Sequence, residues 1–138
     1  MRAVLDVNVI ISALLSRSGS PAAVLRAWQE GRFELIVSPL LLAELERAPG
    51  YPKLRRRIPA EEAEAVVNWL RRAATVAPDS EGPPPTRSVD PGDDYLLVLA
   101  ASENAILVSG DDHVLSLEDQ LPVYSPALFL GFLEASDQ

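Results

Sequence analysis

Short apolar runs that alternate with helical segments are the feature of this sequence that most constrains its fold. Arg2 to Val7, Phe33 to Val37 and Ala105 to Ser109 each read as a strand with a continuous apolar centre, and shorter strands are expected at Val76 and over Val123 to Tyr124. Such strands are usually buried on both faces, as in parallel sheets, whose neighbouring strands need helical crossovers. The sequence therefore predicts a three-layer, Rossmann-like α/β domain with a central parallel sheet of four to five strands flanked by helices.

Capping and breaking residues mark where the helices are expected to begin and end. Ser20 is the expected N-cap of a helix whose first residue is Pro21, and Ser38 is the expected N-cap of the next helix, Pro39 to Arg47. The second of these is expected to turn four leucines towards the core: Leu40, Leu41, Leu42 and Leu45. Further helices are expected over Val9 to Leu15, about Ala60 to Ala73, Asp93 or Asp94 to about Ser102, and Pro126 to Leu133.

The length and composition of the chain exclude several classes of protein. With 138 residues, 48% of them hydrophobic, the sequence suits one globular domain, residues 1–138. It contains no cysteine, so disulfides and thiolate metal sites are excluded. No apolar run is long enough to cross a membrane and no signal peptide is recognised, so we expect a cytoplasmic protein. The net charge of −8 disfavours tight, non-specific binding of nucleic acid.

Four acidic positions are predicted to meet at one edge of the sheet. Asp6 and Asp111 each follow a predicted strand, and ligands bind beyond the carboxyl ends of the strands in parallel sheets. Glu44 stands among leucines on or beside the apolar face of its helix, which is an unusual place for a solvated glutamate. The pair Asp93 and Asp94 opens a later helix, where either residue would also serve as a cap.

Several carboxylates held together repel one another unless cations lie between them. Oxygen ligands select hard divalent ions, so one or two ions of Mg²⁺ or Mn²⁺ are expected at this cluster. Such ions activate water and stabilise the leaving oxygen when a phosphodiester bond is hydrolysed. The sequence therefore predicts a hydrolase that needs no nucleophile from the protein.

Four segments of the chain also resemble, in order, the motifs of a known family. They are Asp6 to Ala13, Ser38 to Leu45, Asp90 to Asp94 and Leu107 to Asp112. The family that they resemble is that of the PIN domains, a nuclease fold common among the toxins of bacterial and archaeal toxin–antitoxin pairs. The four motifs occur in sequence at the expected spacing and span nearly the whole chain, so together they are specific to this family.

The resemblance implies a metal site formed by Asp6, Glu44, Asp93 and Asp111, with polar support from Asn8, Ser12 and Ser109. The third of these ligands has an alternative. Counting back from Asp111 without a gap favours Asp93, whereas alignment on Asp90 and Pro91 favours Asp94. We prefer Asp93.

The resemblance further implies a Mg²⁺- or Mn²⁺-dependent endoribonuclease that cuts single-stranded RNA, acts as the toxin of a pair and binds an antitoxin protein. A basic cluster is available to contact RNA phosphates near the site: Lys53, Arg55, Arg56 and Arg57. The last predicted helix is apolar on several sides, which suits burial against the sheet, a second copy of the chain, or an antitoxin segment. We expect the protein to form a homo-oligomer, a dimer.

Two other interpretations are weighed against the nuclease. The same fold could act as a non-catalytic RNA- or protein-binding module, but the fact that all four acidic positions are filled favours the enzyme. A phosphatase with an aspartyl nucleophile would want a second aspartate two residues after Asp6, and this chain has Asn8 there.

Overall fold

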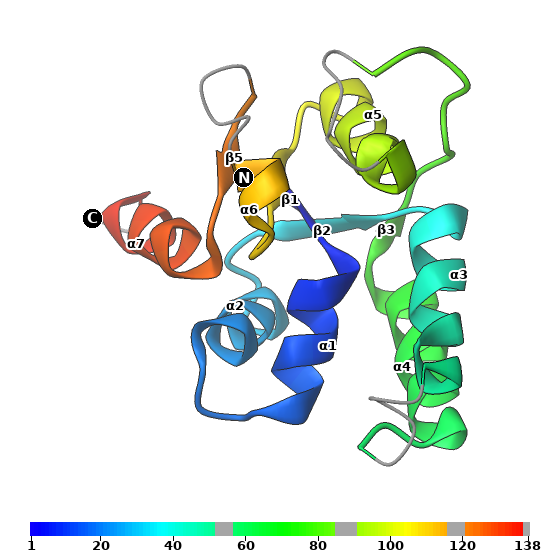
Figure 1. The fold of residues 1–138 in the computed structure, drawn as a ribbon. Coiled ribbons are helices and arrows are strands. Elements are labelled where there is room, and N and C mark those ends of the chain that lie inside the picture. Colours follow the sequence, from blue (N-terminus) through cyan, green and yellow to red (C-terminus); the bar gives the residue numbers. More distant parts are fainter. Residues whose placement is uncertain (52–56, 85–90, 116–120, 137–138) are drawn as a thin grey trace.

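A sheet of five parallel strands forms the centre of the computed structural model, which describes residues 1–51, 57–84, 91–115 and 121–136 (Figure 1). The strands are β1 (Arg2–Leu5), β2 (Glu34–Val37), β3 (Thr75–Val76), β4 (Ile106–Val108) and β5 (Val123–Tyr124), in the order β3-β2-β1-β4-β5. The central strand is β1, and its Ala3 lies opposite Leu35 of β2 and Ile106 of β4. The predicted parallel sheet is confirmed.

Helices cover both faces of this sheet. They are α1 (Val7–Leu15), α2 (Ser20–Gln29), α3 (Pro39–Arg47), α4 (Ala60–Ala73), α5 (Asp94–Ser102), α6 (Asp112–Leu115) and α7 (Pro126–Ser136), with the short 3-10 helices η1 (Ala48–Gly50) and η2 (Pro91–Asp93). In Figure 1, α5 and α6 lie on one side of the sheet, and α1, α2 and α4 lie on the other. The helix α3 packs against α4 and α1, and α7 packs against α2 and β5. This arrangement confirms the predicted three-layer architecture.

Apolar residues of the sheet and of both helical layers form the core. All residues of β1 after Arg2 and the last three residues of β2 are buried, because helices cover both faces of these strands. Aromatic pairs join the helices to this core: Phe33 meets Phe129 edge-on with ring centroids 5.0 Å apart, and Trp28 meets Trp69 at 4.9 Å. Among the described helices, none reaches the length and apolarity that crossing a bilayer requires.

The strands are shorter than the sequence suggested. The strand β1 ends at Leu5 rather than Val7, because the side chain of Asp6 already caps α1, which begins two residues earlier than expected. Likewise, β2 begins at Glu34 and β4 covers only Ile106–Val108. The turn of helix α6 was not predicted; it begins where the carbonyl of Asp111 accepts hydrogen bonds from the following backbone.

Two expectations about helices were wrong. Ser20 is the first residue of α2 and not its N-cap; Gly19 takes the cap position without a side-chain hydrogen bond. Leu40 does not face the core but is 49% exposed, whereas Leu41 and Leu45 are buried as predicted. Successive helical positions are turned by about 100°, so a run of three leucines cannot all face one side. The predicted cap of α3 is confirmed, since Ser38 Oγ accepts the backbone N–H of Leu41 at 3.3 Å.

Candidate active site

A pocket of about 200 Å³ lies beside the carboxyl end of β1, between the start of α1, α3 and η2. Its lining comes from separate parts of the chain: Asp6, Val7, Asn8 and Ile11, then Glu44, Ala48 and Tyr51, and finally Asp93. Three of the four predicted acidic ligands therefore share one pocket. Its position agrees with the rule that ligands bind beyond the carboxyl ends of parallel strands.

Asp6 is the most enclosed acid of this pocket, with 4% of its surface exposed. One carboxylate oxygen accepts the backbone N–H of Asn8 at 3.2 Å, and the other accepts the hydroxyl of Ser109 at 2.9 Å. Burial raises the pKa of Asp6 and the negative charge of Asp111 adds to this, whereas the hydrogen bonds from Ser109 and from the backbone lower it. A nearby cation would favour the ionised form of this carboxylate.

Ser109 joins the ends of β1 and β4. Its buried hydroxyl donates to Asp6 and accepts the backbone N–H of Asp111 at 3.0 Å. Beside it, the backbone N–H of Asp6 donates to the carbonyl of Val108 at 2.9 Å, which continues the pairing of the two strands. Because one hydroxyl serves both acidic segments, Ser109 sets the spacing between Asp6 and the turn that carries Asp111.

Glu44 reaches the pocket from α3 and meets the hydroxyl of Tyr95. The helix α3 turns its apolar side into the core, and Glu44 lies partly buried at the edge of that side. The hydroxyl of Tyr95, on α5, donates a hydrogen bond to Oε2 of Glu44 at 2.8 Å. The predicted position of Glu44 beside the apolar face is therefore observed.

Tyr95 also shows that the pocket acids act on the same small region. Burial raises the pKa of Tyr95, and the hydrogen bond to Glu44 and the negative charges of Glu44, Asp6 and Asp93 raise it further. One hydroxyl thus lies within the influence of three acids from three separate segments of the chain.

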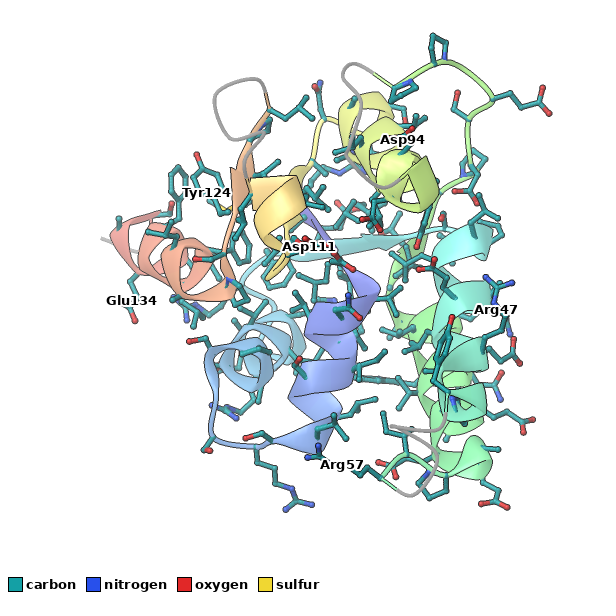
Figure 2. The ribbon with its side chains drawn as sticks, viewed as in Figure 1. Arg47, Arg57, Asp94, Asp111, Tyr124 and Glu134 are labelled. Atoms are coloured by element: carbon teal, nitrogen blue, oxygen red, sulfur yellow. The ribbon has the colours of Figure 1, made fainter. Side chains whose placement is uncertain are left out.

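Asp93, and not Asp94, lines the pocket. Asp93 ends η2 and precedes the first turn of α5, whereas Asp94 is the first residue of α5, where Figure 2 labels it. Of the two alternatives for the third acid, the fold brings Asp93 to the pocket that Asp6 and Glu44 line.

Asp111 opens onto a neighbouring hollow of about 270 Å³. The lining of this hollow is Asn8, Val9, Ser12, Pro21, Gly110, Asp111 and Pro126. Asn8 lines both hollows, so the two are adjacent, and the charge of Asp111 acts on Asp6. In Figure 2, Asp111 lies near the centre of the view, between α6 and the start of α1. The fourth predicted acid is therefore a neighbour of the pocket, beside the predicted helper Ser12.

Of the four residues of the predicted basic cluster, the described part of the structure includes Arg57 alone. Lys53, Arg55 and Arg56 lie outside the described residues. Arg57 is exposed and lies at the lower edge of the molecule in Figure 2, away from Asp111. Arg57 is also not among the residues that line the pocket of Asp6, Glu44 and Asp93.

Two tyrosines at the site were missed by the sequence analysis. Tyr95 could have been noticed as the aromatic residue of an otherwise aliphatic helix, two positions after Asp93. Tyr51 lines the pocket and is 57% exposed; it follows the break at Pro49 and Gly50 that ends the helix of Glu44. An aromatic residue in such a break is a weak signal without knowledge of the pocket.

The donor chemistry of the pocket suits a hard divalent cation, because three carboxylates from separate segments of the chain line it. In the described ranges, no three acidic or histidine side chains form a group that could hold a metal ion in its present geometry. Side-chain rotation about the pocket would have to bring the carboxylates together around an ion. The acids fit the chemistry of such a site without being preassembled for it.

Comparison with known proteins relates most of this chain to one family. A family model described as the PIN domain matches residues 2–113. An uncharacterized protein of Methanocaldococcus jannaschii is 29% identical over 122 residues, which are 87% of this chain and 77% of the relative.

Solved structures have the same fold. The VapBC-1 structure from nontypeable Haemophilus influenzae matches with a TM-score of 0.64 and 19% sequence identity. The match covers 92% of this chain and 99% of the chain in that structure. The structure of VapBC2 from Rickettsia felis, bound to a DNA fragment from the promoter, matches with a TM-score of 0.61 and 15% sequence identity. The match covers 91% of this chain and 97% of the chain in that structure. FitAcB from Neisseria gonorrhoeae has a TM-score of 0.58 at 16% identity and covers 90% and 97%. The match over residues 2–113, together with this shared fold, shows that the chain belongs to the PIN domain family, a family of nucleases.

Proposed function

We propose that this protein is a metal-dependent endoribonuclease that hydrolyses phosphodiester bonds of single-stranded RNA. The main support is the pocket that Asp6, Glu44 and Asp93 line together although they are far apart in the sequence. Acids that the fold gathers from three segments repel one another, and a structural role does not need such a gathering. A bound cation that also contacts the phosphate of a substrate would explain why the fold gathers these acids.

The proposed cofactor is Mg²⁺ or Mn²⁺, as one ion or two. Asp6, Glu44 and Asp93 would hold it, with Asp111 contributing from the adjacent hollow. When bound, the ion would activate water and stabilise the charge that develops on the leaving oxygen. Ser109 and the backbone of Asn8 would keep the carboxylate of Asp6 oriented towards it.

The shape of the pocket supports a substrate that passes over it. Clefts that enclose a whole small ligand usually measure roughly 300–1,000 Å³, and this pocket of about 200 Å³ is smaller. A phosphate group with its ions fits within such a volume. The exposed ring of Tyr51 at the pocket would offer a stacking surface for a base of an unpaired strand.

A role as the toxin of a toxin–antitoxin pair is part of the proposal. The likeness in fold to VapBC-1, VapBC2 and FitAcB supports it, and an antitoxin protein would then be the natural partner. The predicted dimer stays a prediction.

Cleavage of single-stranded RNA tests the proposal, with Glu44→Gln and Asp6→Asn as the informative variants. We expect cleavage that needs Mg²⁺ or Mn²⁺ and falls by more than about a hundredfold in both variants, since even the loss of an outer-shell partner costs about 10- to 100-fold. Glu46→Gln is the matched control, because Glu46 is an exposed residue of α3 that does not line the pocket.

The same cleavage assay distinguishes the proposed nuclease from the rival function, a non-catalytic binding module. A protein that binds RNA without cutting it, in the presence of either metal, would be the non-catalytic binding module instead. Full cleavage by Glu44→Gln would contradict the proposed site.

A further inference from the structure

We propose that Tyr95 is a positioning residue of the candidate metal site: its hydroxyl holds one oxygen of Glu44 and so orients that carboxylate for an ion. The inference rests on the proposed function, because it assigns Glu44 as a metal ligand. It adds to the four acids a residue of α5, the helix that follows Asp93.

The contact between Tyr95 and Glu44 joins two helices that lie far apart in the sequence. The hydroxyl of Tyr95 donates to Oε2 of Glu44 at 2.8 Å across a separation of 51 residues. Within the described ranges, this is the hydrogen bond that the Glu44 side chain accepts, and its Oε1 accepts none. Among the described residues, one oxygen of Glu44 is thus held by a hydrogen bond while the other is available for a further ligand.

The surroundings explain why Glu44 needs such a partner. Glu44 shares its pocket with Asp6 and Asp93, whose charges would push its carboxylate away when no ion is bound. A hydroxyl donor can hold a carboxylate in place without neutralising its charge. Partners of this kind fix the orientation of metal-binding side chains in other proteins.

The ring of Tyr95 is fixed independently of its hydroxyl. Tyr95 is partly buried and packs against the apolar core, and its helix α5 lies against β1 and β4. Its ring has only two rotatable side-chain bonds, so once packed it presents the hydroxyl at a constant place. Tyr95→Phe therefore removes the hydrogen bond to Glu44 and leaves the packed ring.

The test is a titration of the metal-free protein with Mn²⁺ alone. Calorimetry and the melting temperature of the protein both measure the binding of Mn²⁺. We expect Tyr95→Phe to keep its fold and to need roughly 10- to 100-fold more Mn²⁺ than the unmodified protein for half-maximal binding. RNA cleavage should recover when Mn²⁺ is raised in proportion. Tyr124→Phe is the matched control, since Tyr124 is a partly buried tyrosine of β5 that packs against Phe132 and does not line the pocket.

A second variant shows whether the effect runs through Glu44. In a Glu44→Gln background, the further change Tyr95→Phe should alter Mn²⁺ binding little, because the two groups act as one unit. Equal Mn²⁺ binding by Tyr95→Phe and the unmodified protein would overturn the inference while leaving the proposed nuclease intact. If the unmodified protein neither binds Mn²⁺ nor cuts RNA, the proposed function fails and the inference fails with it.

Discussion

At the scale of single residues, Asp6 shows how the candidate site and the stability of the fold oppose each other. Its carboxylate is nearly removed from solvent and stands close to the charge of Asp111, and both effects raise its pKa. The folded state therefore binds the proton of Asp6 more tightly than the unfolded chain does. The free energy of unfolding therefore falls as the pH rises from the pKa of Asp6 in the unfolded chain to its higher pKa in the folded protein. Above that range the loss of stability is complete and stays constant.

We predict that Asp6→Asn stabilises the metal-free protein at neutral pH, because the amide carries no charge and can still accept a hydrogen bond. At a pH below about 3.9, the ordinary pKa of an aspartate, the gain should vanish, since Asp6 is then protonated in both states. Urea unfolding at the two pH values measures the difference. Glu46→Gln, which removes an exposed charge outside the pocket, is the control, and a gain of equal size at both pH values would contradict the prediction.

Asp93 and Asp94 are chemically equivalent neighbours that the fold treats differently. Asp93 lines the pocket and Asp94 does not. We predict that Asp93→Asn lowers metal-dependent RNA cleavage by more than about tenfold, as expected when an interaction with the bound metal is lost, while Asp94→Asn lowers it little. Cleavage rates of the two variants at the same metal concentration check this. A severe loss confined to Asp94→Asn would restore the alternative alignment.

At the scale of elements, the helix α3 matters most because it carries Glu44. Two side chains satisfy its first backbone N–H groups: Ser38 accepts from Leu41 at 3.3 Å, and Asp79 accepts from Leu40 at 2.9 Å. Ser125 caps α7 in the same way, through the backbone N–H of Leu128 at 3.2 Å. Ser125 is therefore a control for Ser38. Both serines cap a helix in the same way, but α3 carries Glu44 whereas α7 carries none of the acids of the candidate site.

We predict that Ser38→Ala and Ser125→Ala each lower the free energy of unfolding by about 1 kcal/mol. Ser38 is fully buried, so its loss should cost the more of the two. Only Ser38→Ala should also slow RNA cleavage, by roughly two- to tenfold, because small displacements of a catalytic group reduce the rate. Urea unfolding and cleavage assays measure both effects. Equal slowing by the two variants would mean that stability alone, and not the placement of α3, governs the rate.

At the scale of the whole molecule, the net charge of −8 and the carboxylates that line the pocket lead us to expect that divalent cations stabilise the folded state, as the proposed metal site requires. We predict that Mg²⁺ or Mn²⁺ at a hundredfold excess over its Kd stabilises the fold by about 2.7 kcal/mol. That gain corresponds to a rise of several degrees in the melting temperature.

Thermal melting with each divalent salt, against NaCl at equal ionic strength, measures the effect. Glu44→Gln should lose most of the rise, because the pocket then lacks one of its carboxylates. An equal rise in the unmodified protein and in Glu44→Gln would place the bound ions elsewhere on the acidic surface.

The local sequence was sufficient for the architecture and for part of the site. Continuous apolar runs predicted β1, β2 and β4, and Ser38 predicted the start of α3, because burial periodicity and helix capping depend on residues close together in the chain. Asp6 was recognised because it directly follows a strand of a parallel sheet. The resemblance to PIN domains then related Asp6, Glu44 and Asp93 to one site.

Tertiary packing alone decided which side chains meet. The hydrogen bond from Tyr95 to Glu44 joins α5 to α3, and the choice of Asp93 over Asp94 depends on how η2 approaches α1 and α3. Arg57 lies away from Asp111 for the same reason, although its charge suggested a role beside the acids. These relations depend on the distance and angle between elements, which follow from the packing of the whole core rather than from any short stretch of sequence.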